Sequence, residues 1–151
     1  MSTTTIAPAH PASFPLFDTK VAVLLSSDLA PWQELNVTAF LMSGIAVSAN
    51  GLTGEPYVDG DGTVYLPMLR QPVLVMTGEL ALLQSARTKA TARGDISVAI
   101  YTRPLFDTGH DDANRAAVAS VRSADLDLVG LALRGPRNAV DRILKGARLH
   151  G

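Results

Sequence analysis

Cysteine is absent from this 151-residue sequence, which excludes disulfide bridges, thiol nucleophiles and thiolate metal sites. The absence fits a reducing compartment, and we expect a cytoplasmic protein. Charge is also scarce. Charged residues make up 18% of the chain and the formal net charge is -1, so no overall field attracts nucleic acid or a membrane surface. No apolar run approaches the roughly 20 residues of a membrane span, and we expect no membrane partner.

Hydrophobic residues, by contrast, make up 47% of the sequence, which excludes a disordered chain and is enough to build a core. Residues 1–19 differ from the rest, because they are rich in Ser, Thr, Pro and Ala and lack the basic start and apolar run of a secretory signal. We expect residues 1–19 to form a flexible leader, in which His10 has no function, and residues 20–151 to form a single domain.

Continuous aliphatic segments predict the central strands of a buried sheet. They are residues 20–26, 72–78, 96–102 and 126–135. The segments between them have helical spacing and capping signals. They are residues 31–50, 79–92, 112–120 and 136–145. This alternation predicts an α/β fold, a three-layer α/β/α sandwich whose mixed, mostly parallel sheet has about four central strands plus a hairpin.

Helix 31–50 carries apolar residues at helical spacing, which predicts an amphipathic helix. They are Trp32, Leu35, Ala39, Met42 and Ala46. The hairpin is predicted at residues 57–66, where the turn is Asp59-Gly60-Asp61-Gly62. Its two acids suggest a calcium loop, but the third acidic or Asn ligand and the closing glutamate of that motif are missing. We therefore expect an ordinary turn and no bound metal.

Ligands of such sheets bind beyond the carboxyl ends of the strands. We expect that rim to bring together Asp28, Arg103 and Arg134, with Trp32 and Asn36 on the following helix as a platform for stacking and hydrogen bonding. Each has a structural alternative. Asp28 suits a helix N-cap, Trp32 suits the core, and Arg134 suits a solvated turn.

Polar residues are densest in segment 103–115. His110 is a candidate general base oriented by Asp111 or Asp112, with an arginine binding an anion. The alternative is a helix entrance, where the two acids favour the positive end of the helix and Asn114 and Arg115 are solvated. His-Asp-Asp also resembles a set of metal ligands, but adjacent acids rarely converge on one ion. We expect neither a metal nor a cofactor.

Several segments together resemble a known family. They are KVAVLLSSDL, YLPMLRQPVLV, TGHDDANRAAV and LVGLALRGPRNAVDRILKGARLH. The chain is similar to the family called domain of unknown function 2000 and resembles the peptidyl-tRNA hydrolase type II fold, over nearly everything after Lys20. The resemblance implies a hydrolase II-like scaffold, on which homodimers are common. Only Asp28 matches the hydrolase residue by residue.

The hydrolase carries a lysine, a glutamine and a histidine along its first helix. In one alignment those positions hold Asn36, Phe40 and Ser43; shifted by one residue, they hold Leu35, Ala39 and Met42. Neither set supplies basic or titratable groups. The resemblance therefore implies a scaffold without the hydrolase chemistry.

Our leading hypothesis is an uncharacterised hydrolase II-like protein that binds a small molecule at the strand-end rim. The contacts we expect are Asp28, Trp32, Asn36, Arg103, His110, Asn114 and Arg134. One alternative is a hydrolase or transferase that uses His110 with Asp111 or Asp112. The other is a module that binds tRNA or other RNA through basic residues. They are Arg134, Arg137, Arg142, Lys145 and Arg148.

Overall fold

A computed structural model describes residues 17–151 of the chain. The leader predicted at residues 1–19, with His10, lies outside the described residues except for its last three positions. Thr19 already belongs to the first strand. Within the described residues, no helix is both long enough and apolar enough to cross a bilayer.

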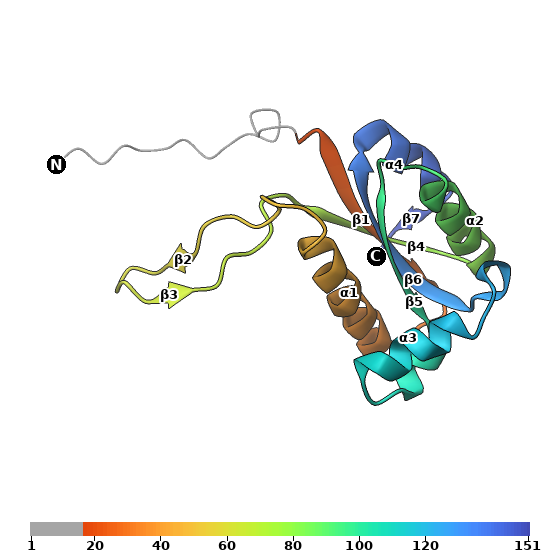
Figure 1. Ribbon diagram of the computed structural model, residues 1–151. Helices are drawn as coiled ribbons and strands as arrows, with labels where there is room; N and C mark the ends of the chain where they lie inside the picture. Colours follow the sequence, from red (N-terminus) through yellow and green to blue (C-terminus); the bar gives the residue numbers. More distant parts are fainter. Residues whose placement is uncertain (1–16) are drawn as a thin grey trace.

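The main sheet has five strands in the order β5-β6-β1-β4-β7 (Figure 1). The strands are β1 Thr19–Ser26, β4 Val73–Gly78, β5 Ser97–Thr102, β6 Leu128–Pro136 and β7 Arg148–Leu149. The helices are α1 Pro31–Ala46, α2 Leu80–Thr91, α3 Asp111–Ala119 and α4 Arg137–Ile143, with short 3₁₀ helices η2 Arg103–Asp107 and η3 Ser123–Asp125. The four predicted strands and four predicted helices are all present. The two-residue strand β7 is an addition.

The prediction of a mostly parallel sheet is wrong. In the described sheet, β1 and β4 are parallel, whereas β6 is antiparallel to both β1 and β5, and β7 is antiparallel to β4. A parallel neighbour requires the chain to cross back over the sheet. Between β5 and β6 the chain makes no such crossing, because η2 and α3 lie beside the α1 face near the end of β5 and the chain returns directly (Figure 1).

Helices cover both faces of the sheet, and β1 is buried between them. On one face Val21, Val23 and Leu25 pack against α1. On the other face Ala22 and Leu24 pack in the cluster to which α2 and α4 contribute (Figure 1). The prediction that residues 20–26 form a central strand is confirmed, since alternation along the strand sends apolar side chains to both covered faces. The prediction that Ala139, Val140, Ile143 and Leu144 face inward is also confirmed.

The inward face of α1 differs from the predicted stripe. Val37, Leu41 and Ile45 are buried, whereas Trp32 is 61% and Leu35 74% exposed. The helix is apolar on most of its circumference, so spacing alone does not select the packed side. Gly130 of β6 selects the packed side of α1, because the absence of a side chain there leaves room for Val37 and Leu41. A Cβ added at Gly130 would lie 2.6 Å from Val37 Cγ1.

The predicted hairpin is confirmed, but it forms a separate two-stranded sheet, so it does not supply the antiparallel strands of the main sheet. Its strands are β2 Tyr57–Val58 and β3 Val64–Tyr65, and we call residues 53–69 the arm. The Asp59 carboxylate accepts hydrogen bonds from the Asp61 and Thr63 N–H groups and from the Tyr65 hydroxyl. The Asp59 carboxylate is therefore taken up by hydrogen bonds within the turn. The described residues contain no group of three or more His, Asp or Glu able to hold a metal.

Candidate ligand-binding cleft

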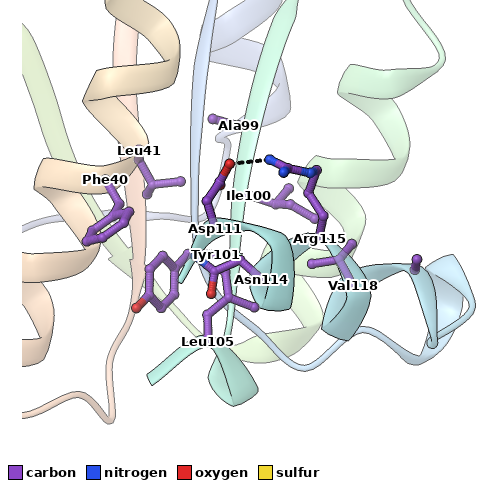
Figure 2. A pocket seen from close by; sticks show the side chains of 11 residues that line it. Phe40, Leu41, Ala99, Ile100, Tyr101, Leu105, Asp111, Asn114, Arg115 and Val118 are labelled. Atoms are coloured by element: carbon purple, nitrogen blue, oxygen red, sulfur yellow. Dashed lines mark hydrogen bonds and ion pairs between the residues drawn. The ribbon is translucent and has the colours of Figure 1, made fainter. Parts of the chain in front are cut away.

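A cleft lies over the edge strand β5, between α1 on one side and the η2–α3 segment on the other (Figure 2). It has two adjoining compartments of about 510 and 330 Å³. Both are in the range of small-molecule sites, about 300–1,000 Å³. Residues from all three elements line both compartments. They are Phe40, Tyr101, Leu105, Asp111 and Asn114.

An aromatic row crosses this cleft. The ring centroids of Trp32 and Phe106 are 5.7 Å apart, those of Phe106 and Tyr101 5.1 Å, and those of Tyr101 and Phe40 5.8 Å. Figure 2 shows Phe40 and Tyr101 side by side at one end of the larger compartment. Four of the eight aromatic residues in the chain belong to the row. Trp32 and Phe40, the two ends of the row, are more than half exposed, whereas Tyr101 within the row is only 4% exposed and lies at the floor of the cleft.

Two amides stand beside the row. Asn36 Nδ2 donates a hydrogen bond to the Tyr101 hydroxyl at 3.4 Å. Burial raises the pKa of Tyr101, with the Asn36 hydrogen bond acting in the opposite direction, so the phenol keeps its proton at neutral pH and can donate it. Asn114 Oδ1 is hydrogen-bonded to Thr108 Oγ1, whose hydroxyl also lies 3.0 Å from the Leu105 carbonyl oxygen. The cleft thus offers hydrogen-bonding groups within an apolar lining.

His110 lines the smaller compartment and caps α3, where its Nδ1 accepts the N–H of Ala113 at 3.2 Å. The neutral ring therefore carries its proton on Nε2. Arg115 forms ion pairs with both Asp111 and Asp112, and Figure 2 shows the Asp111 pair. The carboxylates expected to orient His110 bind this arginine instead. Both acids lie in the first turn of α3, as the helix-entrance alternative expects, but Arg115 is paired with them.

Asp28 and Arg103 meet at the rim, as predicted. Arg103 Nη2 lies 3.2 Å from both Asp28 carboxylate oxygens, and Arg103 Nε lies 3.3 Å from Asp127 Oδ2. The Ser26 hydroxyl, which donates to Asp28 at 2.6 Å, and the Arg103 guanidinium lower the pKa of Asp28. With two carboxylates around it, Arg103 is a poor anion site. The pair instead ties the loop before α1, the helix that carries Trp32, to η2, which carries Phe106. Asp28 is not the helix N-cap, because Ala30 occupies that position.

Arg134 does not share this rim. It lies opposite Val21 and Ser97, near the amino ends of β1 and β5, because β6 runs antiparallel to both strands. The other basic residues of the RNA hypothesis are spread out as well. Arg137 begins α4 at the end where Arg134 lies, whereas Arg148 lies opposite Thr77 near the carboxyl end of β4. The described residues therefore separate Arg134 and Arg137 from Arg148 by the length of the sheet.

A family model described as "Protein of unknown function (DUF2000)" matches residues 19–151. The chain belongs to this family. A solved structure titled as a protein of unknown function, Atu0240 from Agrobacterium tumefaciens strain C58, is 46% identical, with a TM-score of 0.86. The match covers 90% of this chain and 100% of the other. No curated protein matches significantly. The mixed α/β fold is therefore shared with this relative, and the role of the cleft in the DUF2000 chain is argued from its geometry.

The cleft of this DUF2000 protein contains residues that the sequence did not single out as candidates. They are Phe40, Tyr101, Leu105, Phe106 and Thr108. A signal for some of them was present, since Tyr101 ends an aliphatic strand and the apolar pair Leu105-Phe106 interrupts a polar segment. Of the predicted contacts, the cleft brings together Trp32, Asn36, His110 and Asn114.

Proposed function

We propose that this DUF2000 protein binds a small, planar, uncharged molecule in the cleft between α1 and α3. The observation that carries the proposal is the aromatic row flanked by the Asn36 and Asn114 side chains. Aromatic rings stack on planar ligands at low conformational cost. Amides donate and accept hydrogen bonds and so read the edge of a heterocycle. The volumes of the compartments suit a ligand of nucleoside size.

The charges around the cleft favour an uncharged ligand. Arg115 is bound to Asp111 and Asp112, and Arg103 is bound to Asp28 and Asp127. An anionic ligand would have to displace one of these carboxylates and would gain little by doing so. A neutral ring system covers the exposed part of Trp32 without breaking an ion pair.

The scaffold in this proposal is hydrolase II-like, a three-layer sandwich that has lost the chemistry of its relatives. Helices on both faces of a mixed sheet support it. No lysine, arginine or histidine lies in α1, the helix that carries the hydrolase groups in that fold. Phe40 and Asn36 instead line the cleft, so positions used for catalysis there are available for binding here. We keep the cytoplasm as the proposed location because the chain has no cysteine.

The two alternatives have less support. A hydrolase or transferase needs a carboxylate to orient His110, and Arg115 holds both nearby ones. An RNA-binding module needs a continuous basic surface, but its predicted arginines lie at both ends of the sheet.

Trp32 is the only tryptophan of the chain and lines this cleft, so its fluorescence reports on ligand binding there. We expect a saturable change in emission on titration with adenosine, and a weaker response to adenosine monophosphate because the cleft has no free cation for the phosphate. Asn36→Leu and Asn114→Leu should each weaken binding about 2–12-fold, the loss of one hydrogen bond.

Gln84→Leu is a matched amide control, since Gln84 of α2 contacts the Ala124 and Leu126 carbonyl oxygens away from the cleft. Quinoline and indole extend the titration to planar rings without a sugar. If none of these compounds alters Trp32 emission, or if Asn36→Leu and Gln84→Leu bind them equally well, the proposal is wrong.

A further inference from the structure

The arm, residues 53–69, exposes apolar side chains on both of its strands and on the segment that follows β3. They are Tyr57, Val58, Val64, Tyr65, Leu66 and Met68, each at least half exposed and Leu66 85% exposed. Figure 1 shows the arm reaching away from the sheet and its helices. Single exposed apolar residues are ordinary, but a contiguous set of this size marks an interaction site.

The arm is held in shape before any partner arrives. At its base, the Gly54 N–H donates to the Met68 carbonyl at 3.0 Å and the Arg70 N–H donates to the Leu52 carbonyl at 2.9 Å, and Leu52 is buried in the core. At its tip, the Asp59 carboxylate organises the turn. A two-stranded hairpin is at best marginally stable alone in water, so these contacts at the base and the tip are what hold the arm in shape. Because the arm is already ordered, it loses little conformational freedom when its apolar surface docks on a partner.

A second uncovered surface lies on α1. Its outer side exposes Trp32, Leu35 and Phe40, and Val47 extends this surface just beyond the end of the helix. The single charged residue of α1 is Glu34, and it is bound to His150. The outer face of a surface helix is normally polar. This one lacks the charges that would keep it in water.

We propose that the arm of one copy lies along the outer face of α1 in a second copy, and that the second arm does the same in return. The lengths agree. The 16-residue α1 is about 24 Å long, and the outgoing side of the arm, from Gly54 to the Asp59 turn, extends about 20 Å. The side chains that would meet are apolar on both surfaces. The charged residues of the arm are Glu55 near its base and Asp59 and Asp61 at its turn, and all three are exposed, so they can stay in solvent while the apolar side chains are covered.

The area suits a stable pair. The apolar side chains of the arm leave on the order of 700 Å² exposed, given areas of about 150–250 Å² for large residues. A standard interface buries about 800 Å² per partner, and the α1 face adds to the arm. In a dimer with two-fold symmetry, the contact between arm and α1 occurs twice, and no surface is left over to add a third copy. A second copy of the chain as the partner also explains why one chain carries both the apolar arm and the apolar face of α1. Trp32 and Phe40 belong both to this surface and to the cleft, so the partner's arm and a ligand would share these two side chains.

The molar mass from size-exclusion chromatography with light scattering tests the inference. We expect the full chain at micromolar concentration to have twice the mass of one chain. Val64→Glu combined with Leu66→Glu should shift it to a monomer while circular dichroism stays unchanged, because both side chains are exposed. Leu80→Glu is the matched control. Leu80 is also an exposed leucine, at the start of α2 away from the arm and α1, and should leave the dimer intact.

Cross-linking tests the arrangement, because the chain has no cysteine of its own. Val58→Cys on the arm and Leu35→Cys on α1 are prepared as separate proteins, mixed and treated with a short bismaleimide. Cross-links should form mainly in the mixture. A monomeric wild-type chain, a dimer insensitive to the arm glutamates, or cross-links mainly within the Val58→Cys sample would each overturn the proposal. So would a monomer that sediments with lipid vesicles through the same residues, because the arm would then be a membrane contact.

Discussion

Gly130→Ala is expected to push α1 away from the sheet. Gly130 lies in β6 between Leu25 on β1 and Tyr101 on β5. The added Cβ would lie 2.6 Å from Val37 Cγ1 and 3.1 Å from Leu41 Cδ1, whereas ordinary contact begins at 3.4 Å. Val37 is β-branched and fully buried, so it cannot rotate aside and the helix itself has to move.

The expected cost follows from two opposing effects. Overpacking a core costs about 1–3 kcal/mol. Replacing glycine by alanine within a strand returns about 0.5–1 kcal/mol of backbone entropy. We expect the free energy of unfolding to fall by about 1–2 kcal/mol, which for a chain of this size lowers Tm by roughly 3–6 °C. Because Asn36 and Phe40 flank Val37 on the same helix, the cleft should also widen and Trp32 emission should change.

Urea unfolding followed by circular dichroism measures the first effect, and fluorescence of the folded protein measures the second. Gly94→Ala is the matched control, since no heavy atom lies within 4 Å of its added Cβ, and it should leave stability unchanged or slightly higher. Combining Gly130→Ala with Val37→Ala should cost less than the sum of the two single changes, because the alanine at 37 makes room. Equal stability of Gly130→Ala and wild type, or additive single changes, would refute this account of how α1 meets the sheet.

Three further predictions concern titrating groups. The Glu34 carboxylate raises the pKa of His150. The ion pair therefore stabilises the folded state at pH values below the unfolded-state pKa of about 6.5, and this stabilisation is lost as the pH rises through the folded-state pKa of His150. In urea unfolding at different pH values, His150→Gln should abolish this loss of stability. The Ser26 hydroxyl is the largest cause that lowers the pKa of Asp28. The ionised Asp28 therefore stabilises the folded state above the unfolded-state pKa of about 3.9, and this stabilisation is lost as the pH falls further. Acid unfolding of Asp28→Asn that matches wild type would contradict this. Burial raises the pKa of Tyr101, and phenolate absorbance should include a component ionising above about 10 that Tyr101→Phe removes.

The sequence was sufficient to place the buried strands. Residues 21–25 are apolar at every position, which is the pattern of a strand covered on both faces. Strand direction was not predictable in this way, because an aliphatic run is the same in either direction. The antiparallel course of β6 depends on η2 and α3 returning the chain without a crossing, and on pairings with β1 and β5 that local spacing does not encode.

The cleft was predicted in part. Trp32, Asn36, His110 and Asn114 come together because α1 and α3 flank β5. The alternative prediction for Trp32 was burial in the core, since tryptophan with leucine at helical spacing is commonly buried. In α1, apolar residues continue around the helix, and only the space above Gly130 decides that Val37 faces inward. A glycine about ninety positions later in the chain therefore determines which side of α1 stays in solvent.

The pairing of β1 with β6 also has a consequence for synthesis. Val23 pairs with Ala132, so β1, the first strand of the described residues, cannot complete this pairing until the chain has been made as far as β6. At about 5–20 residues per second, this delay is on the order of ten seconds. During that time one of the most aliphatic stretches of the nascent chain has only its β4 neighbour to pair with. Until β6 has been made, the edge of β1 that pairs with it therefore has no strand partner in the described sheet.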